Sequence, residues 1–160
     1  MPEKYFRLAL AILTLCVLSI SAGSAHAATD LKLNPDLNYS SDSNDGPLIT
    51  GKNMSDGTLT AGKPAYIIFY HSECNNSKSQ DKRTVTLYEK YKNRVDFIIV
   101  DLDSPRSPGQ SALVSRHYGR YIPHVTVYDK SGKAVYDKSG EVGNAVMTDL
   151  LDGLISGQSG

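Results

Sequence analysis

Tryptophan is absent from this sequence, cysteine is nearly absent, and neither sign of charge is in excess. The 160 residues contain no tryptophan and two cysteines, and Lys plus Arg number 17, as do Asp plus Glu. A nucleic-acid-binding surface needs clustered excess basic charge, so the composition argues against a nucleic-acid partner. The length suits one domain with additional segments rather than two ordinary domains.

Long apolar runs are also missing after the first 27 residues. The chain begins with a short basic stretch containing Lys4 and Arg7, continues with an apolar run over 8–20, and then has small residues ending at Ala27. This pattern predicts a secretory signal peptide over 1–27, cut after Ala27. The run is short for a membrane span, which takes ~20 residues, so cleavage is favoured over an uncleaved anchor. We therefore expect an exported protein, periplasmic or secreted, without membrane attachment after cleavage.

Cleavage would leave a single cysteine in an oxidising compartment. Cys16 lies within the signal peptide, and Cys74 is the other cysteine. A lone cysteine cannot form an internal disulfide, so Cys74 is buried, reactive, or paired with another molecule.

The remaining sequence predicts a polar leader followed by an α/β domain. Residues 28–46 are rich in Asn, Asp and Ser, and we expect a flexible leader there. Residues 47–160 form the predicted domain, whose turn-rich start holds a short strand near Leu48 and Ile49. Continuous apolar runs and helical spacing then predict a three-layer sandwich with a mixed central sheet. The expected strands are 65–70, 95–102, 125–128 and 134–136, and the expected helices are 75–93, 109–118 and 144–155.

Cys74 lies where the first buried strand gives way to a helix. The thiolate is the reactive form of cysteine, and the positive end of a helix dipole favours it. The surrounding segment 72–77 is polar, whereas structural cysteines usually lie inside strands or helices. The position therefore favours a nucleophilic thiol over an inert cysteine.

The order of motifs from 63 to 156 resembles the thioredoxin superfamily. In that family a Lys-Pro start precedes a buried strand, a C-x-x-C motif opens a helix, and an Ile-Pro precedes a β-hairpin and a terminal helix. The matching residues here are Lys63-Pro64, Phe69-Tyr70, Cys74 to Ser77, Asp101, Tyr118-Gly119, Ile122-Pro123, the Ser131-Gly132 turn and the helix around 150–155.

The resemblance implies the roles of three residues. Cys74 matches the nucleophilic cysteine, and Ser77 replaces the resolving cysteine. Pro123 matches the family's cis-proline, which shapes a peptide groove, and Ile122 and Tyr121 stand beside that groove as candidates for substrate contact.

Two other positions depart from the family pattern. Ile68 stands where many members have a buried carboxylate, and Glu73 stands where tryptophan is usual. A carboxylate beside a cysteine opposes formation of the thiolate when the two are close.

The resemblance and the single thiol together predict thiol–disulfide exchange through a mixed disulfide, of a monothiol or isomerase-like kind. Ser77 cannot resolve the mixed disulfide, since exchange needs a second thiolate. That thiol would come from the substrate or from a redox partner protein. The expected partners are protein or small-molecule thiols and disulfides, and the chemistry needs no cofactor.

Two alternatives remain open at this point. One is a non-catalytic module that binds peptides near Pro123. The other is a metal-handling protein that uses His71, Cys74 and His124 as ligands. We expect instead that both histidines face solvent at strand ends, and that His117 also lies on the surface.

Overall fold

The computed structural model describes residues 29–41, 46–52 and 56–157. The predicted signal peptide lies outside these residues. Within the described part of the chain, no helix combines the length and apolar character needed to cross a membrane.

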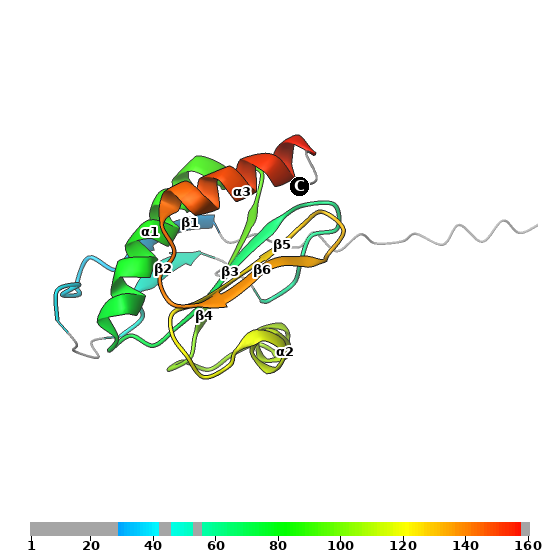
Figure 1. Cartoon of the computed structure of the whole chain (residues 1–160). Coiled ribbons are helices and arrows are strands. Elements are labelled where there is room, and N and C mark those ends of the chain that lie inside the picture. Colours follow the sequence, from blue (N-terminus) through cyan, green and yellow to red (C-terminus); the bar gives the residue numbers. More distant parts are fainter. Residues whose placement is uncertain (1–28, 42–45, 53–55, 158–160) are drawn as a thin grey trace, which may run out of the picture.

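The described residues form six strands and three helices in three layers (Figure 1). Helices α1 and α3 cover one face of the central sheet and α2 covers the other. The strands are β1 (Thr29–Leu33), β2 (Ile49–Lys52), β3 (Ala65–Tyr70), β4 (Asp96–Asp101), β5 (His124–Tyr128) and β6 (Ala134–Ser139), and the helices are α1 (Asn75–Tyr91), α2 (Pro108–His117) and α3 (Asn144–Ser156). The α/β class and mixed sheet predicted from the sequence are confirmed.

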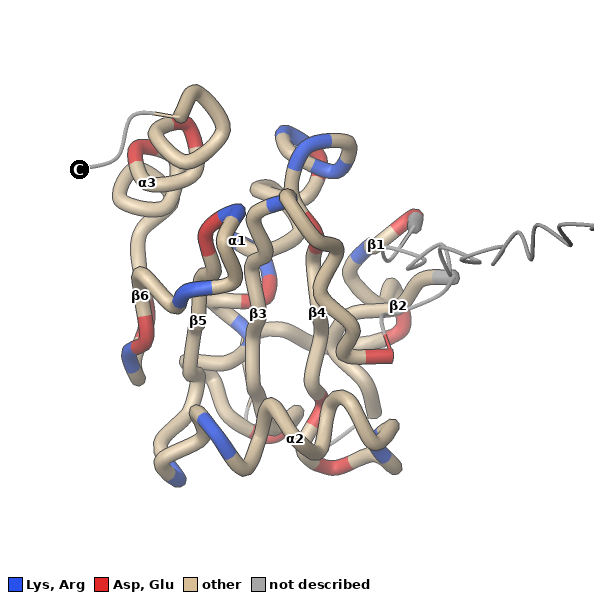
Figure 2. The backbone as a smooth tube through the Cα atoms, turned by 90° about the vertical axis from the view of Figure 1, so that its right-hand side faces the viewer, with Lys and Arg blue, Asp and Glu red and all other residues tan. Residues whose placement is uncertain are grey.

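The central sheet has the strand order β4-β3-β5-β6, as Figure 2 shows from the side. Strands β3 and β4 are parallel, whereas β3 with β5 and β5 with β6 are antiparallel. All six residues of β3 are buried, as expected of a central strand covered on both faces. The register pairs Phe69 with His124, so the end of β3 and the start of β5 meet at one edge of the sheet.

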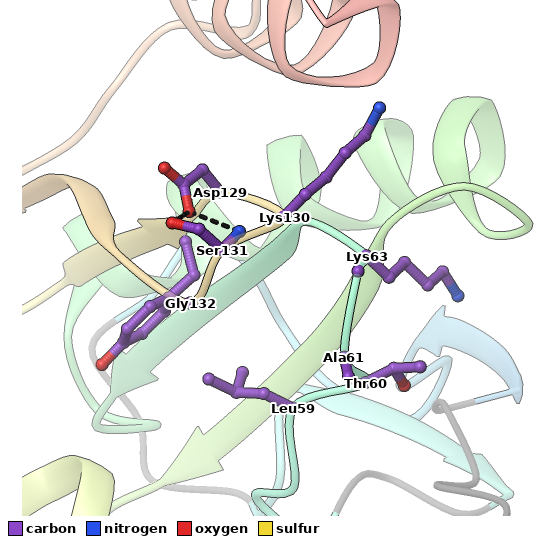
Figure 3. A pocket seen from close by; sticks show the side chains of 10 residues that line it. Leu59, Thr60, Ala61, Lys63, Asp129, Lys130, Ser131 and Gly132 are labelled. Carbon is purple, nitrogen blue, oxygen red and sulfur yellow. Dashed lines mark hydrogen bonds between the residues drawn. The ribbon is translucent and has the colours of Figure 1, made fainter.

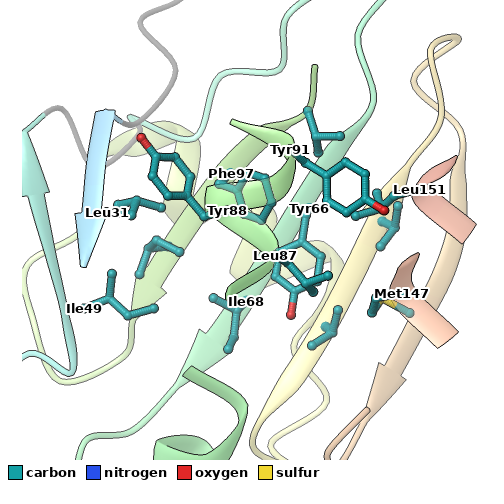
Figure 4. Packing of buried hydrophobic residues seen from close by; sticks show 14 of the residues in the cluster. Leu31, Ile49, Tyr66, Ile68, Leu87, Tyr88, Tyr91, Phe97, Met147 and Leu151 are labelled. Atoms are coloured by element: carbon teal, nitrogen blue, oxygen red, sulfur yellow. The ribbon is translucent and has the colours of Figure 1, made fainter. Parts of the chain in front are cut away.

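The larger core lies between the sheet and the helices α1 and α3 (Figure 4). Its centre is aromatic. The ring of Phe97 lies 5.3 Å from that of Tyr66 and 5.5 Å from that of Tyr88, measured between centroids. A smaller core, around Phe69, Val100 and Leu113, fills the space under α2. Together the two cores fix the central strands that carry the candidate site.

The N-terminal segment differs from the predicted flexible leader. Residues 29–33 form β1, which pairs antiparallel with β2 in a separate two-stranded sheet. Leu31 is buried in the larger core, and the backbone amide of Asp30 donates to the Tyr88 hydroxyl of α1 at 2.7 Å. The ordered domain therefore begins by residue 29 rather than 47. The segment has few apolar residues, so its order comes from its partners β2 and α1.

Candidate functional site

Cys74 is the N-cap residue of α1, directly after the loop that follows β3. Its backbone is extended (φ −93°, ψ 121°), and its carbonyl accepts the first bond of the helix from the amide of Lys78 at 3.0 Å. The thiol is free and the residue is partly exposed. The structure thus places a free, partly exposed cysteine at the N-terminus of a helix of 17 residues.

Asp103 anchors the loop that carries Cys74. One carboxylate oxygen accepts from the Ser72 amide at 2.8 Å and from the Ser72 hydroxyl at 3.0 Å, and the other lies 2.6 Å from His71 Nδ1. Partial burial raises the pKa of Asp103, but the hydrogen bonds from Ser72 and His71 outweigh it and hold that pKa below its usual value. The ionised carboxylate therefore ties the end of β3 to the segment that follows β4.

Pro123 lies at the same edge of the sheet, directly before β5. The Ile122–Pro123 peptide bond is cis, as the resemblance implies. The Pro123 carbonyl accepts from the Gly140 amide at 2.8 Å. Ile122 is half-buried, whereas Tyr121 is 73% exposed, which makes it the most exposed large apolar side chain of the described residues.

Within the described part of the chain, two of the buried polar side chains of α1, Ser77 and Asp81, are unpartnered in the two turns that follow Cys74. Ser77 and Asp81 are both 0% exposed, and neither the Ser77 hydroxyl nor either Asp81 oxygen has a hydrogen-bond partner among the described residues. Burial, and secondly the charge of Asp101, raise the pKa of Asp81 well above its usual value. A buried polar group without a partner is destabilising, so both side chains call for a functional explanation.

Asp81 is not among the functional residues predicted from the sequence. A signal was nevertheless present, because Asp81 shares its helical stripe with Thr84, Tyr88 and Tyr91, all buried. An acidic residue on a buried stripe that begins near a cysteine at a helix N-terminus is a functional candidate.

The predicted exposure of His124 and His117 is wrong, because their side chains are only 7% and 5% exposed. His124 packs edge-on against Phe69 with ring centroids 5.6 Å apart. Asp137 on β6 joins the two histidines, at 2.7 Å from His124 Nε2 and 2.9 Å from His117 Nδ1. The sequence could not reveal this pairing, which depends on the β5–β6 register and on the packing of α2.

Hydrogen bonds occupy the second ring nitrogen of each of these histidines as well. Nδ1 of His124 lies 2.9 Å from the Ser139 hydroxyl, and Nε2 of His117 bonds to the Tyr128 hydroxyl. Partial burial raises the pKa of Asp137, but hydrogen bonds from the two histidines and Thr126 leave it below its usual value.

The candidate metal ligands His71, Cys74 and His124 do not form a metal site. Among the described residues, no group of three or more His, Cys, Asp or Glu side chains is arranged to hold a metal ion. His71 is engaged with Asp103 and His124 with Asp137. The structure therefore gives no support to the metal-handling alternative.

A separate hollow lies at the opposite end of the sheet, between the loop 59–63 and the β5–β6 turn (Figure 3). Its volume is about 170 Å³, below the roughly 300–1,000 Å³ of typical small-molecule sites. Ser131 donates to Asp129 on one side of it. The hollow is therefore unrelated to Cys74 and too small to suggest a second ligand site.

Comparison with known proteins supports the fold. No protein-family model and no curated protein matches the chain. Among solved structures it is similar to thioredoxin-2, a component of the protein secretion machinery of the malaria parasite, with 17% identity, a TM-score of 0.50 and coverage of 59% of this chain and 85% of that chain. A second structure, of a malarial protein, has 17% identity, a TM-score of 0.48 and coverage of 58% and 98%. The described domain thus has a thioredoxin-like fold.

Proposed function

We propose that this protein carries out thiol–disulfide exchange through Cys74 acting as a single thiol. The observation that carries the proposal is that Cys74 is a free, partly exposed residue at the N-terminus of α1. Thiols in such positions are the ones that react in proteins, whereas structural cysteines are buried. The thioredoxin-like fold is consistent with redox chemistry of this class.

The exchange begins when the Cys74 thiolate attacks one sulfur of a substrate disulfide. A bond forms between Cys74 and that sulfur, the substrate disulfide breaks, and the other substrate sulfur leaves as a thiolate that takes up a proton. Ser77 has no sulfur with which to release the mixed disulfide. A second thiol, from the substrate or from a redox partner protein, must therefore attack it and restore Cys74.

The residues beside cis-Pro123 favour a polypeptide substrate. Tyr121 is exposed and Ile122 half-buried at the edge where Cys74 lies. Exposed aromatic side chains are enriched where proteins bind one another. We infer that an extended substrate segment contacts Tyr121 and Ile122 while its disulfide reaches Cys74.

Export is part of the same proposal, and its support is the signal-peptide pattern over 1–27. An oxidising compartment would supply disulfide substrates.

The proposal is tested by treating the full chain with glutathione disulfide and mapping the adduct by peptide mass spectrometry. We expect one glutathione on the peptide containing Cys74 and none there in Cys74→Ser. The matched control is Ser79→Cys, which places a thiol five residues further along the chain, inside α1. We expect it to react more slowly than Cys74. A Cys74 that resists modification until the protein is denatured would overturn the proposal.

A non-catalytic peptide-binding module is the second candidate, and the exposure of Tyr121 favours it equally. Thiol–disulfide exchange requires the Cys74 thiol, whereas peptide binding alone does not. Peptide binding that survives in Cys74→Ala, in a protein whose Cys74 is unreactive, would establish the module.

A further inference from the structure

The segment that carries Tyr121 and Ile122 is held at its ends rather than along its length. Residues 118–123 connect the end of α2 to the start of β5, and they are yellow in Figure 1. Among the described residues, 119–122 make no hydrogen bond or ion pair with another segment. Arg120 has a φ of +69°, which residues other than glycine adopt only where the surrounding structure imposes it. The flanking residues therefore set the shape of this segment.

The residues at the two ends are histidines that share one carboxylate. His117 is the last residue of α2, and His124 is the first residue of β5. One oxygen of Asp137 on β6 lies 2.7 Å from His124 Nε2, and the other lies 2.9 Å from His117 Nδ1. The Thr126 hydroxyl donates to the first oxygen at 2.9 Å, which fixes the carboxylate against β5. A single side chain thus joins both ends of the segment.

The charge of Asp137 determines which groups donate. Partial burial raises the pKa of Asp137, but hydrogen bonds from the two histidines outweigh burial and leave that pKa below its usual value. An ionised carboxylate only accepts hydrogen bonds, so His124 Nε2 and His117 Nδ1 both donate to it. The remaining ring nitrogens bond to the hydroxyls of Ser139 and Tyr128. Two hydrogen bonds therefore fix the orientation of each ring.

The same two ends also pack on the strand that leads to Cys74. The ring of His124 lies 5.6 Å from that of Phe69, and the ring of Tyr118 lies 6.4 Å from the same phenylalanine, measured between centroids. Phe69 belongs to β3, and the loop that follows β3 carries Cys74. The histidines and Asp137 therefore fix the segment relative to the strand that positions the thiol.

We propose that Asp137 positions segment 118–123, through the two histidines, in the shape that presents Tyr121 to a polypeptide substrate. The inference rests on the proposed function, because it concerns the substrate that reaches Cys74. Asp137 acts through other residues and does not touch the reacting sulfur. It should therefore affect how well a peptide binds, and not how reactive the thiol is.

The test uses two disulfide reagents with the same reacting group. One is an extended peptide whose central cysteine is a thiopyridyl disulfide, and the other is N-acetylcysteine amide activated in the same way. With both reagents the Cys74 thiolate attacks the cysteine sulfur and forms a disulfide with it. The bond to the pyridyl sulfur breaks, and pyridine-2-thiolate leaves, takes up a proton and is measured as the product. The rate is followed against reagent concentration in the full chain.

Asp137→Ala removes the contact with both rings. We expect the half-saturating concentration of the peptide to rise about tenfold, because the segment must then be ordered when the peptide binds. The rate at saturation and the rate with the small reagent should keep their parent values, as expected when only binding is lost. Lys138→Ala changes the exposed neighbour on β6. It is the matched control and should follow the parent with both reagents.

His117→Phe is a second variant, which keeps a ring at the end of α2 and removes only one of the two contacts. It should raise the half-saturating concentration of the peptide by less than Asp137→Ala does. It also tests the same link if Asp137→Ala does not fold.

The possible failures are distinguishable. A half-saturating concentration equal to that of the parent, in Asp137→Ala or in a His117→Phe that replaces it, would overturn this inference and leave the proposed function standing. An equal loss of rate with both reagents would overturn it as well, since Asp137 would then act on the thiol. A parent protein whose Cys74 reacts with neither reagent would overturn the proposed function, and this inference with it.

Discussion

The buried hydroxyl of Ser77 occupies a site where a thiol would be less costly to bury. Its oxygen has no partner among the described residues, and sulfur is less costly than oxygen to bury without one. Cys74 precedes it by three residues on the same side of α1, which puts their Cα atoms roughly 5–6 Å apart, within the range that a disulfide accepts.

Ser77→Cys should therefore form an internal disulfide with Cys74 on mild oxidation. It should also gain disulfide reductase activity toward insulin, because the second thiol completes the exchange within one molecule. Mass and free-thiol counts of the oxidised variant are the measurement. Two cysteines that stay free under conditions that oxidise ordinary dithiols would contradict the placement of residues 74 and 77.

Asp81 should make the stability of the protein fall with increasing pH. Its folded-state pKa is raised above the unfolded value by burial and by Asp101. Its protonated form therefore stabilises the fold below the unfolded pKa, about 4, and this contribution is lost as pH rises toward the folded pKa.

Asp81→Asn should remove that loss. At pH 8 its free energy of unfolding should exceed that of the parent by more than about 1 kcal/mol, because no buried charge remains. At pH 3 the two free energies should be almost equal. Urea unfolding at both pH values is the measurement. Equal effects at pH 3 and pH 8 would show that ionisation of Asp81 is not the cause.

Residues could be placed from the sequence where a motif identified them. Cys74 lies at the predicted helix start, and Pro123 precedes its predicted strand. Asp81 and the Asp137 bridge between two histidines could not be predicted, because each depends on burial created by distant segments. The local sequence around a polar residue does not show whether the residue will be buried, because its burial depends on how distant elements pack.

The backbone of the loop around Gly57 packs directly against the backbone of the first turn of α2. A Cβ at Gly109 would lie 2.4 Å from the carbonyl oxygen of Asp56. Gly57, with φ +89°, faces the backbone of the same turn. The side chains of Ser107 and Gln110 form a capping box there, in which the Gln110 amide donates to Ser107 Oγ at 3.0 Å.

Gly109→Ala should destabilise the protein by about 1–3 kcal/mol, because the clash is with backbone and overpacking is costly. Alanine favours a helix over glycine by up to about 1 kcal/mol, so the close contact with Asp56 decides whether the substitution lowers or raises the stability. Gly119→Ala is the matched control, since nothing lies within 4 Å of its Cβ position, and it should change stability by less than about 0.5 kcal/mol. Thermal unfolding of both variants checks the pair. Equal stability in the two would contradict the close approach.

Elements with their own apolar pattern were predictable, and those completed by a partner were not. β3 and α1 begin at the predicted residues, since both have a strong pattern of their own. β6 continues to Ser139, three residues beyond the prediction, because antiparallel pairing with β5 extends it through polar residues. β1 was not predicted, since its polar sequence becomes a strand only beside β2.

Across the whole molecule, the N-terminal segment is part of the domain's core. Leu31 is 1% exposed and lies in the cluster with Ile49 and Tyr88. Leu31→Ala should therefore cost about 2–4 kcal/mol, the range for a large-to-small substitution in a core. The exposed neighbour Lys32 is the control, and Lys32→Ala should stay within about 0.5 kcal/mol of the parent. Midpoints of guanidinium unfolding measure both. A neutral Leu31→Ala would indicate that the segment does not pack as described.

The contacts of α1 with both ends of the domain set the order in which the chain can fold during its own synthesis. The Asp30 amide donates to the hydroxyl of Tyr88, which is 58 residues further along the chain. The hydroxyl of Tyr91 donates to Asp152, which is 61 residues after Tyr91. Contacts between residues so far apart form slowly, because a long loop must close first. A chain still emerging from the ribosome lacks α3, so one flank of α1 stays uncovered until α3 has been made. The larger core can therefore close only after every element from β1 to α3 has left the ribosome.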